Sequence, residues 1–192
     1  MDSAKVDVGR RKFLTQATTI VGGVGAGFAA IPFIGSWLPS AQAKASGAPV
    51  DLDITKIEPG QKVTITWRGK PIFVVHRTDA ALEKLGNIEN KLRDPDSLVS
   101  EQPEYATNKH RALKDKFLVV IGICTHLGCV PVYRPKIGEL EPSWIGGFFC
   151  PCHGSKFDLA GRVFKGVPAP VNLAIPHYRY LDEKTIRIGE EP

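Results

Sequence analysis

The sequence predicts a mainly β fold, in which an antiparallel β domain follows a single N-terminal transmembrane helix. Three observations lead to this prediction: a long stretch without charge near the N-terminus, many short β-rich runs separated by turn residues after residue 50, and four cysteines confined to two short motifs. Hydrophobic residues make up 43% and charged residues 23% of the 192 residues, which excludes wholesale disorder and leaves room for one globular domain.

The N-terminal segment predicts membrane targeting and anchoring. Residues 13–43 contain no ionisable side chain, and the apolar residues 16–38 are long enough to cross a bilayer as a helix. The basic cluster at residues 10–12 precedes them, so we expect residues 1–15 to stay in the cytoplasm. The paired arginines followed by Phe-Leu also resemble a twin-arginine export signal. The alternatives are a buried core helix and a cleaved signal, since an A-x-A pattern ends at Ala43; we favour an uncleaved anchor.

The charge of the chain argues against a nucleic-acid partner. The formal net charge is +5, but residues 1–48 hold five basic and only two acidic side chains, so most of the excess lies at the N-terminus. The remainder of the chain is nearly neutral and shows no basic stripe that would match a phosphate backbone.

A linker and a β-rich head are expected after the helix. Residues 39–49 are mostly small, with a proline at each end, which is typical of a flexible linker. The head is expected over residues 50–192. Its first feature is a hairpin of residues 63–67 and 71–76, and the polar segment 79–111 is expected to cross the surface of the sheet with a short helix at residues 80–85.

Two further β-rich runs lead into the cysteine motifs. Residues 117–123 form a buried strand that ends at Cys124, and residues 146–149 run into Cys150. The C-terminal residues 178–189 alternate around a turn at residues 182–184 and predict another hairpin.

The two motifs contain C-x-H, at Cys124 and His126, and C-x-x-H, at Cys150 and His153. Two thiolates and two imidazoles from two loops are the donors of a Rieske [2Fe–2S] centre, in which histidines replace two cysteines on one iron and raise the potential to about −150 to +300 mV. Tetrahedral zinc is the alternative for closely spaced Cys and His. However, C-x-H is tight for a zinc knuckle, which would also have no use for a second cysteine pair.

The remaining cysteines, Cys129 and Cys152, lie at the outer side of each motif. If both loops close over one cluster, these two thiols face each other and can form a disulfide. The export signal implies an oxidising compartment, where such a bond persists.

These residues carry a resemblance to the Rieske subunits of ubiquinol–cytochrome c reductase. It rests on residues 124–131 and 150–155, continues through Gly161-Arg162 and the proline-rich residues 166–170, and includes the anchor, linker and head layout. The resemblance implies a Rieske-type β domain with a small cluster-binding subdomain at about residues 122–170, and a bacterial inner-membrane protein with its head in the periplasm.

The resemblance also implies the roles of particular residues. Cys124 and Cys150 would bind the buried iron, and His126 and His153 the outer iron. His153 would contact the quinol and accept its proton. Ser155 would donate a hydrogen bond to the cluster, and shielding is expected from Leu127 and Pro168.

The same resemblance implies the partners and the reaction. One electron and a proton would leave ubiquinol, held by the cytochrome b subunit, and the electron would pass to the c-type cytochrome subunit. The complex would be dimeric, coupled to proton translocation, and the chain would not be catalytically complete alone. Two other Rieske carriers are rivals: a soluble ferredoxin that feeds an oxygenase, which generally lacks the cysteine pair and the anchor, and the exported small subunit of an arsenite-oxidase-like enzyme.

Two residues depart from the family pattern. Phe157 stands where family members often have a tyrosine that donates to a ligand sulfur, so we expect a midpoint potential in the lower part of the family's high-potential range. Val167 is an apparent extra residue in the proline-rich loop.

Overall fold

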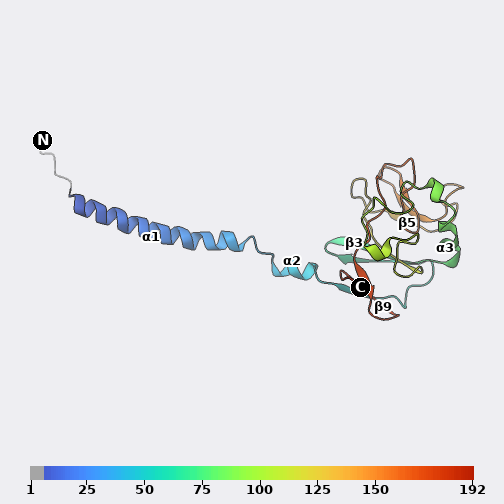
Figure 1. Ribbon diagram of the computed structural model, residues 1–192, viewed down its shortest axis with the longest axis horizontal. Coiled ribbons are helices and arrows are strands. Elements are labelled where there is room, and N and C mark those ends of the chain that lie inside the picture. The colour runs from blue at the N-terminus through green and yellow to red at the C-terminus, as the bar shows by residue number, and fades with distance from the viewer. Residues whose placement is uncertain (1–6) are drawn as a thin grey trace. The chain divides into compact units, whose positions relative to one another are not determined.

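The computed structural model describes residues 7–192 and divides them into two units, one up to Ala45 and one from Ser46 to Pro192 (Figure 1). The first unit holds helix α1 (Val8–Gly35) and all but the last residue of helix α2 (Ala41–Ser46). The second unit contains all nine strands of the described chain, so the predicted mainly β fold with one N-terminal apolar helix is confirmed.

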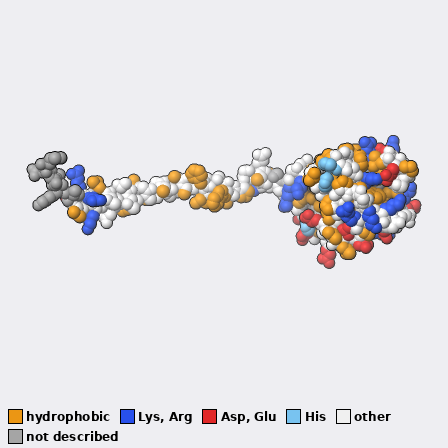
Figure 2. All heavy atoms as spheres, turned by 90° about the horizontal axis from the view of Figure 1, so that it is seen from above, with side chains coloured by type: hydrophobic (Ala, Val, Ile, Leu, Met, Phe, Trp, Pro, Cys, Tyr) orange, Lys and Arg blue, Asp and Glu red, His pale blue; other side chains and the backbone are white. Residues whose placement is uncertain are grey.

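Helix α1 is long and apolar enough to cross a membrane. Asp7 caps it by accepting hydrogen bonds from the amides of Gly9 and Arg10, which satisfies two of the free donors of the first turn. The helix begins at Val8, so the predicted twin-arginine cluster lies within its first turns rather than in an extended tail. Within helix α1, the Lys and Arg side chains are confined to residues 10–12, and Figure 2 shows them at the N-terminal end of the helix.

Helix α2 lies inside the segment predicted as a flexible linker. Ser40 begins it, since its hydroxyl accepts a hydrogen bond from the amide of Ala43. The helix is only six residues long, and a helix of that length has little stability of its own. The flexibility of residues 39–49 therefore stays a prediction.

The head consists of three antiparallel sheets of three strands each, with strand orders β1-β9-β8, β2-β3-β4 and β5-β6-β7. The strands are β1 (Val50–Asp53), β2 (Lys62–Trp67), β3 (Lys70–His76), β4 (Phe117–Ile121), β5 (Val132–Arg134), β6 (Gly147–Cys150), β7 (Ser155–Phe157), β8 (Tyr178–Tyr180) and β9 (Thr185–Ile188). The connections hold helix α3 (Asp79–Leu85) and two short 3₁₀ turns, Glu89–Lys91 and Glu104–Ala106.

The predicted hairpins and the short helix are present. Strands β2 and β3 pair through a two-residue turn in which Arg68 and Gly69 both have positive φ, the conformation that suits the twist of a hairpin. Strands β8 and β9 pair around the C-terminal turn. Helix α3 covers the expected residues, capped by Thr78.

The sheets β2-β3-β4 and β5-β6-β7 together position the metal motifs. Strand β4 is buried along its middle and leads to Cys124, while β6 ends at Cys150 and β7 begins at Ser155. Both cysteines belong to one continuous hydrophobic core with strands β3 and β4. The motifs therefore start from the most firmly packed part of the head.

Candidate metal centre

Two loops of the same construction present the predicted ligands. The first loop spans residues 124–129 and the second spans residues 150–155. In each loop the amide of the fifth residue donates to the carbonyl of the first: Gly128 to Cys124 at 3.0 Å, and Gly154 to Cys150 at 2.9 Å. Each loop is also closed between its two ends, by the amide of Cys124 donating to the carbonyl of Cys129 and by the pairing of Cys150 with Ser155.

The fifth position of each loop requires glycine. Gly128 and Gly154 have φ of 82° and 79°, in the left-handed region where a side chain is strained. A Cβ at either position would meet no other atom within 4 Å, so the backbone conformation rather than space excludes other residues.

The sulfur atoms of the two predicted ligands are buried. Cys124 and Cys150 are each 2% exposed. Burial, and then the neighbouring thiol of Cys124, raise the pKa of Cys150 to about 12. The Cys150 thiol, which holds its proton this tightly, becomes a thiolate when a metal ion takes the place of the proton.

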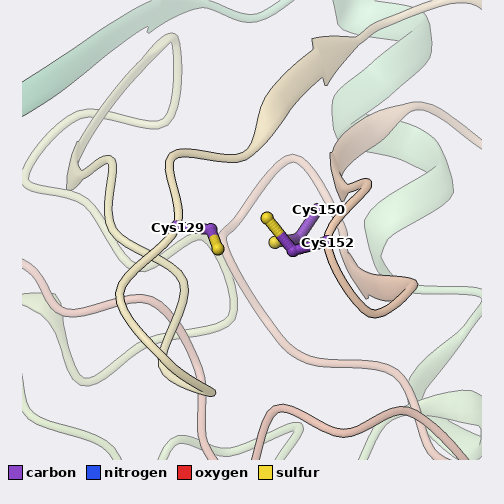
Figure 3. A group of neighbouring side chains, drawn as sticks. All are labelled: Cys129, Cys150 and Cys152. Atoms are coloured by element: carbon purple, nitrogen blue, oxygen red, sulfur yellow. The ribbon is translucent and has the colours of Figure 1, made fainter.

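The other two cysteines lie at the outer edge of the same sulfur cluster. Cys129 is partly exposed and Cys152 is exposed, and the contact with Cys152 is the main cause that raises the pKa of Cys129. The sulfur atoms of Cys129, Cys150 and Cys152 lie within 4.8 Å of one another (Figure 3). All four cysteines are free thiols in the structure, so the Cys129–Cys152 disulfide stays a prediction.

The predicted nitrogen ligands form a pair nearer the surface. The rings of His126 and His153 are 4.7 Å apart between centroids and nearly perpendicular, at 87°. His126 is half-buried and His153 is exposed. Two buried thiols and two adjacent imidazoles that reach solvent fit a two-iron cluster whose cysteine-bound iron is inside and whose histidine-bound iron is outside.

A third segment adjoins both loops. The proline-rich segment 166–170, which we call the Pro loop, is followed by Val171, whose carbonyl accepts a 2.7 Å hydrogen bond from the hydroxyl of Thr125 in the first loop. The amide of Ala169 donates to the hydroxyl of Ser155 in the second loop at 3.1 Å. Ser155 and Ala169 are both fully buried. Because the Ser155 oxygen accepts this bond, its own proton is free to point elsewhere.

The two residues predicted to shield the site both face solvent. Leu127 is 70% exposed at the tip of the first loop, and Pro168 is exposed on the Pro loop. Their shielding role stays a prediction. The sequence analysis missed Thr125 and Ala169, because neither a lone threonine nor a backbone amide in a proline-rich stretch carries a signal that could have found it.

Comparisons with known proteins agree with this geometry. A family described as "Rieske [2Fe-2S] domain" matches residues 49–179, and one described as "Ubiquitinol-cytochrome C reductase Fe-S subunit TAT signal" matches residues 1–40. The ubiquinol-cytochrome c reductase iron-sulfur subunit of Allochromatium vinosum is 54% identical, with 100% of this chain and 93% of that protein covered. The subunit of the same name in Rhodospirillum rubrum is 43% identical, over 94% of this chain and 91% of that protein.

A solved structure is similar as well. A chain of the structure titled "Hyperthermophilic respiratory Complex III" superposes with a TM-score of 0.50 and 26% identity, covering 91% of this chain and 98% of its own. All four predicted ligands fall within the matched Rieske region. Three neighbouring sulfurs alone would also suit zinc, but the match favours an iron–sulfur cluster.

Proposed function

Because the chain belongs to the family of Rieske [2Fe–2S] subunits of ubiquinol–cytochrome c reductase, we propose that its head takes one electron and one proton from ubiquinol and passes the electron to a c-type cytochrome. By membership of this family, the quinol would be held by the cytochrome b subunit of a dimeric complex. The cluster supplies a one-electron acceptor that can later act as a donor. Cys124, Cys150, His126 and His153 would hold it.

The exposed position of His153 next to His126 is the observation that carries this proposal. A quinol hydroxyl can reach His153 from solvent, whereas the buried thiols of Cys124 and Cys150 are out of its reach. The ring nitrogen of His153 that does not bind iron would accept the hydrogen bond of the quinol hydroxyl and then its proton. The electron would leave the quinol at the same contact, and the cluster held by the four ligand residues would accept it.

The surroundings of the site support transfer at an exposed edge. Leu127, which follows His126 in the chain, presents an apolar side chain to solvent, and Pro168 is exposed on the adjoining Pro loop. Apolar groups around a docked quinol would exclude water, which favours direct proton transfer to the imidazole over loss to solvent. A disulfide between Cys129 and Cys152 would pin the two loops to each other on the outer side.

Helix α1 would anchor the head in the bacterial inner membrane. The apolar helix and the matched export signal fit a membrane-anchored subunit with a periplasmic head. The basic residues 10–12 support a cytoplasmic N-terminus, because positive charges next to a membrane helix favour the cytoplasmic side. A mass measurement on the mature protein tests whether the anchor is kept or is cleaved after Ala43.

A redox titration of membranes that contain the complex, followed by low-temperature EPR from neutral to alkaline pH, tests the function. We expect a reduced-state signal of the mixed Cys/His type and a positive midpoint that falls as the pH rises. The variant His177→Gln changes an exposed histidine outside both loops and should leave midpoint and pH dependence unchanged. Zinc without an iron signal would overturn the function, and a negative midpoint insensitive to pH would assign the chain to ferredoxin-like transfer.

A further inference from the structure

The polar segment 91–102, which we call the strap, contacts the chain before the Pro loop, at Val167 and after the loop. Before the loop, the strap and the segment 163–165 form a short antiparallel pair. The amide of Arg93 donates to the carbonyl of Val163, and the amide of Lys165 donates to the carbonyl of Lys91. After the loop, the amide of Ile175 donates to the carbonyl of Glu101. No role could be predicted for this segment from the sequence.

Asn172 joins the strap to the end of the Pro loop. Its side-chain nitrogen donates to the carbonyl of Asp94 and to the hydroxyl of Ser97, both at 2.9 Å, and its oxygen accepts from the amide of Val163 at 2.8 Å. Its own amide donates to the hydroxyl of Ser100 at 3.1 Å. Asn172 is 1% exposed, so these bonds are protected from water.

Asp94 stabilises the turn of the strap through hydrogen bonds within residues 94–100. Its carboxylate accepts from the amides of Leu98 and Val99 and from the hydroxyl of Ser100. Burial opposes its ionisation, but these hydrogen bonds outweigh burial and lower the pKa of Asp94. The strap is therefore a preformed turn and not a solvated loop.

Arg93 fixes the Pro loop directly. Its Nη2 donates to the carbonyl of Val167 at 3.0 Å, immediately before Pro168. Val167 is the apparent extra residue of the loop, and its side chain is buried. The additional residue thus adds a carbonyl for the strap to bind, while its side chain fills the core.

The prolines transmit these anchors to Ala169. Pro168 and Pro170 each have a fixed φ, so the path between Val167 and Val171 has little freedom. Held at Val167 by Arg93 and at its exit by Thr125 and Ser100, this path fixes where the amide of Ala169 points. That amide donates to Ser155.

We propose that Arg93, Asp94 and Asn172 are positioning residues, which hold the Pro loop so that the Ala169 amide turns the Ser155 hydroxyl proton toward the cluster. This inference rests on the proposed function. Ser155 lies opposite Cys150 in the pairing of β6 and β7, so its proton has a sulfur ligand within its neighbourhood. A hydrogen bond to sulfur stabilises the reduced, more negative state, so loosening the strap would lower the midpoint potential.

A double-mutant cycle on the full chain in its complex tests the proposal. Arg93→Gln removes the bond to Val167, and Ser155→Ala removes the hydroxyl. We expect Arg93→Gln to shift the reduced-to-oxidised equilibrium by about threefold toward the oxidised form when Ser155 is present, and to cause no further shift in the Ser155→Ala background. Lys91→Gln removes an equal charge from the strap but keeps the backbone carbonyl that the loop uses, so it should leave the potential unchanged.

Amide hydrogen exchange at Ala169 provides a readout that does not depend on the cluster. We expect about fivefold faster exchange in Arg93→Gln and no change in Lys91→Gln. An equal shift of potential with and without the Ser155 hydroxyl would show that Arg93 acts only through its charge and would overturn the proposal. Unchanged exchange at Ala169 would overturn it too. Absence of the mixed-ligand EPR signal in the unaltered chain would instead refute the proposed function. The exchange rate at Ala169 would then still show whether Arg93 holds the Pro loop in place.

Discussion

The substitution Phe157→Tyr is expected to raise the midpoint potential of the cluster. Phe157 is fully buried on β7, opposite Phe148, and belongs to the same core as Cys124 and Cys150. A hydroxyl at this position would extend from a ring already packed beside the cluster-binding part of the core. If it donates to a ligand sulfur, it stabilises the reduced state, which carries one more negative charge.

The size of the effect follows from the value of one buried hydrogen bond. Such a bond contributes about 0.5–1.5 kcal/mol net, which corresponds to roughly 20–60 mV for a one-electron couple if it acts only on the reduced state. If the hydroxyl finds no acceptor, the fully buried site makes it costly, and the free energy of unfolding should fall by about 1–3 kcal/mol without a gain in potential. Potential and stability together therefore identify which case holds.

An EPR-monitored redox titration and a denaturant unfolding curve measure the two quantities. Phe164→Tyr is the control, because Phe164 is half-buried with its ring 5.9 Å from that of Trp144, and the added hydroxyl should leave the potential unchanged. A higher potential with little loss of stability supports the reasoning. An unchanged or lower potential in Phe157→Tyr would refute it.

Three other predictions concern the loops and the core beneath them. Gly154→Ala should lower the free energy of unfolding by about 1–2 kcal/mol in a denaturant titration, because only the positive φ opposes it, and Gly154→Asn should recover part of the loss. Arg111→Met should cost roughly 3 kcal/mol or more, because the buried guanidinium donates to three carbonyls, and Arg111→Lys should restore some of it; equal stability of the two variants would contradict this account. If Cys129 and Cys152 form a disulfide, alkylation of the exported protein after denaturation without reductant should modify two cysteines per chain, and modification of four would disprove the bond.

Local patterns were sufficient to predict much of the head. The hairpin of β2 and β3 follows from alternating apolar residues around Arg68-Gly69, and the C-terminal hairpin follows from the same kind of pattern. The metal motifs could be recognised because the spacing of Cys124 and His126, and of Cys150 and His153, is itself the signal. In each case the interacting residues are close in sequence.

Contacts between distant segments could not be predicted in this way. Strand β1 pairs with β9 at the opposite end of the head, and a single four-residue run such as Val50–Asp53 does not specify its partner. The strap has a composition typical of a solvated loop. Asp94 and Asn172 are nevertheless buried, because they are hydrogen-bonded to each other although 78 positions separate them. The side-chain nitrogen of Asn172 donates to the carbonyl and to the carboxylate of Asp94. Polar residues can be buried when other segments supply their hydrogen-bond partners, and the sequence does not show which distant residues those partners are.

The connection from the second loop to the Pro loop also has buried polar groups whose hydrogen-bond partners are distant in the sequence. Residues 158–161 lie outside the strands, yet they are fully or almost fully buried, so their carbonyls need donors. Arg77 donates to Leu159, and Arg111 donates to Ala160 and Gly161. Burial lowers the pKa of each guanidinium to about 10, so both remain charged near neutral pH and keep all their protons.

Guanidinium groups thus supply donors to this segment in addition to its backbone hydrogen bonds, such as the one from the amide of Leu173 to the carbonyl of Gly161. A guanidinium has five donors in a rigid plane, so Arg111 can serve several carbonyls from a single side chain, where a strand would need a row of amides. The chain that leads into the Pro loop therefore has a fixed point at Val163, two residues after Gly161, where the amide donates to the side chain of Asn172. The strap has only the remaining, proline-restricted part of the loop to hold, and the bond from Arg93 to Val167 adds to the bonds that Asn172 makes with Val163 and Asp94.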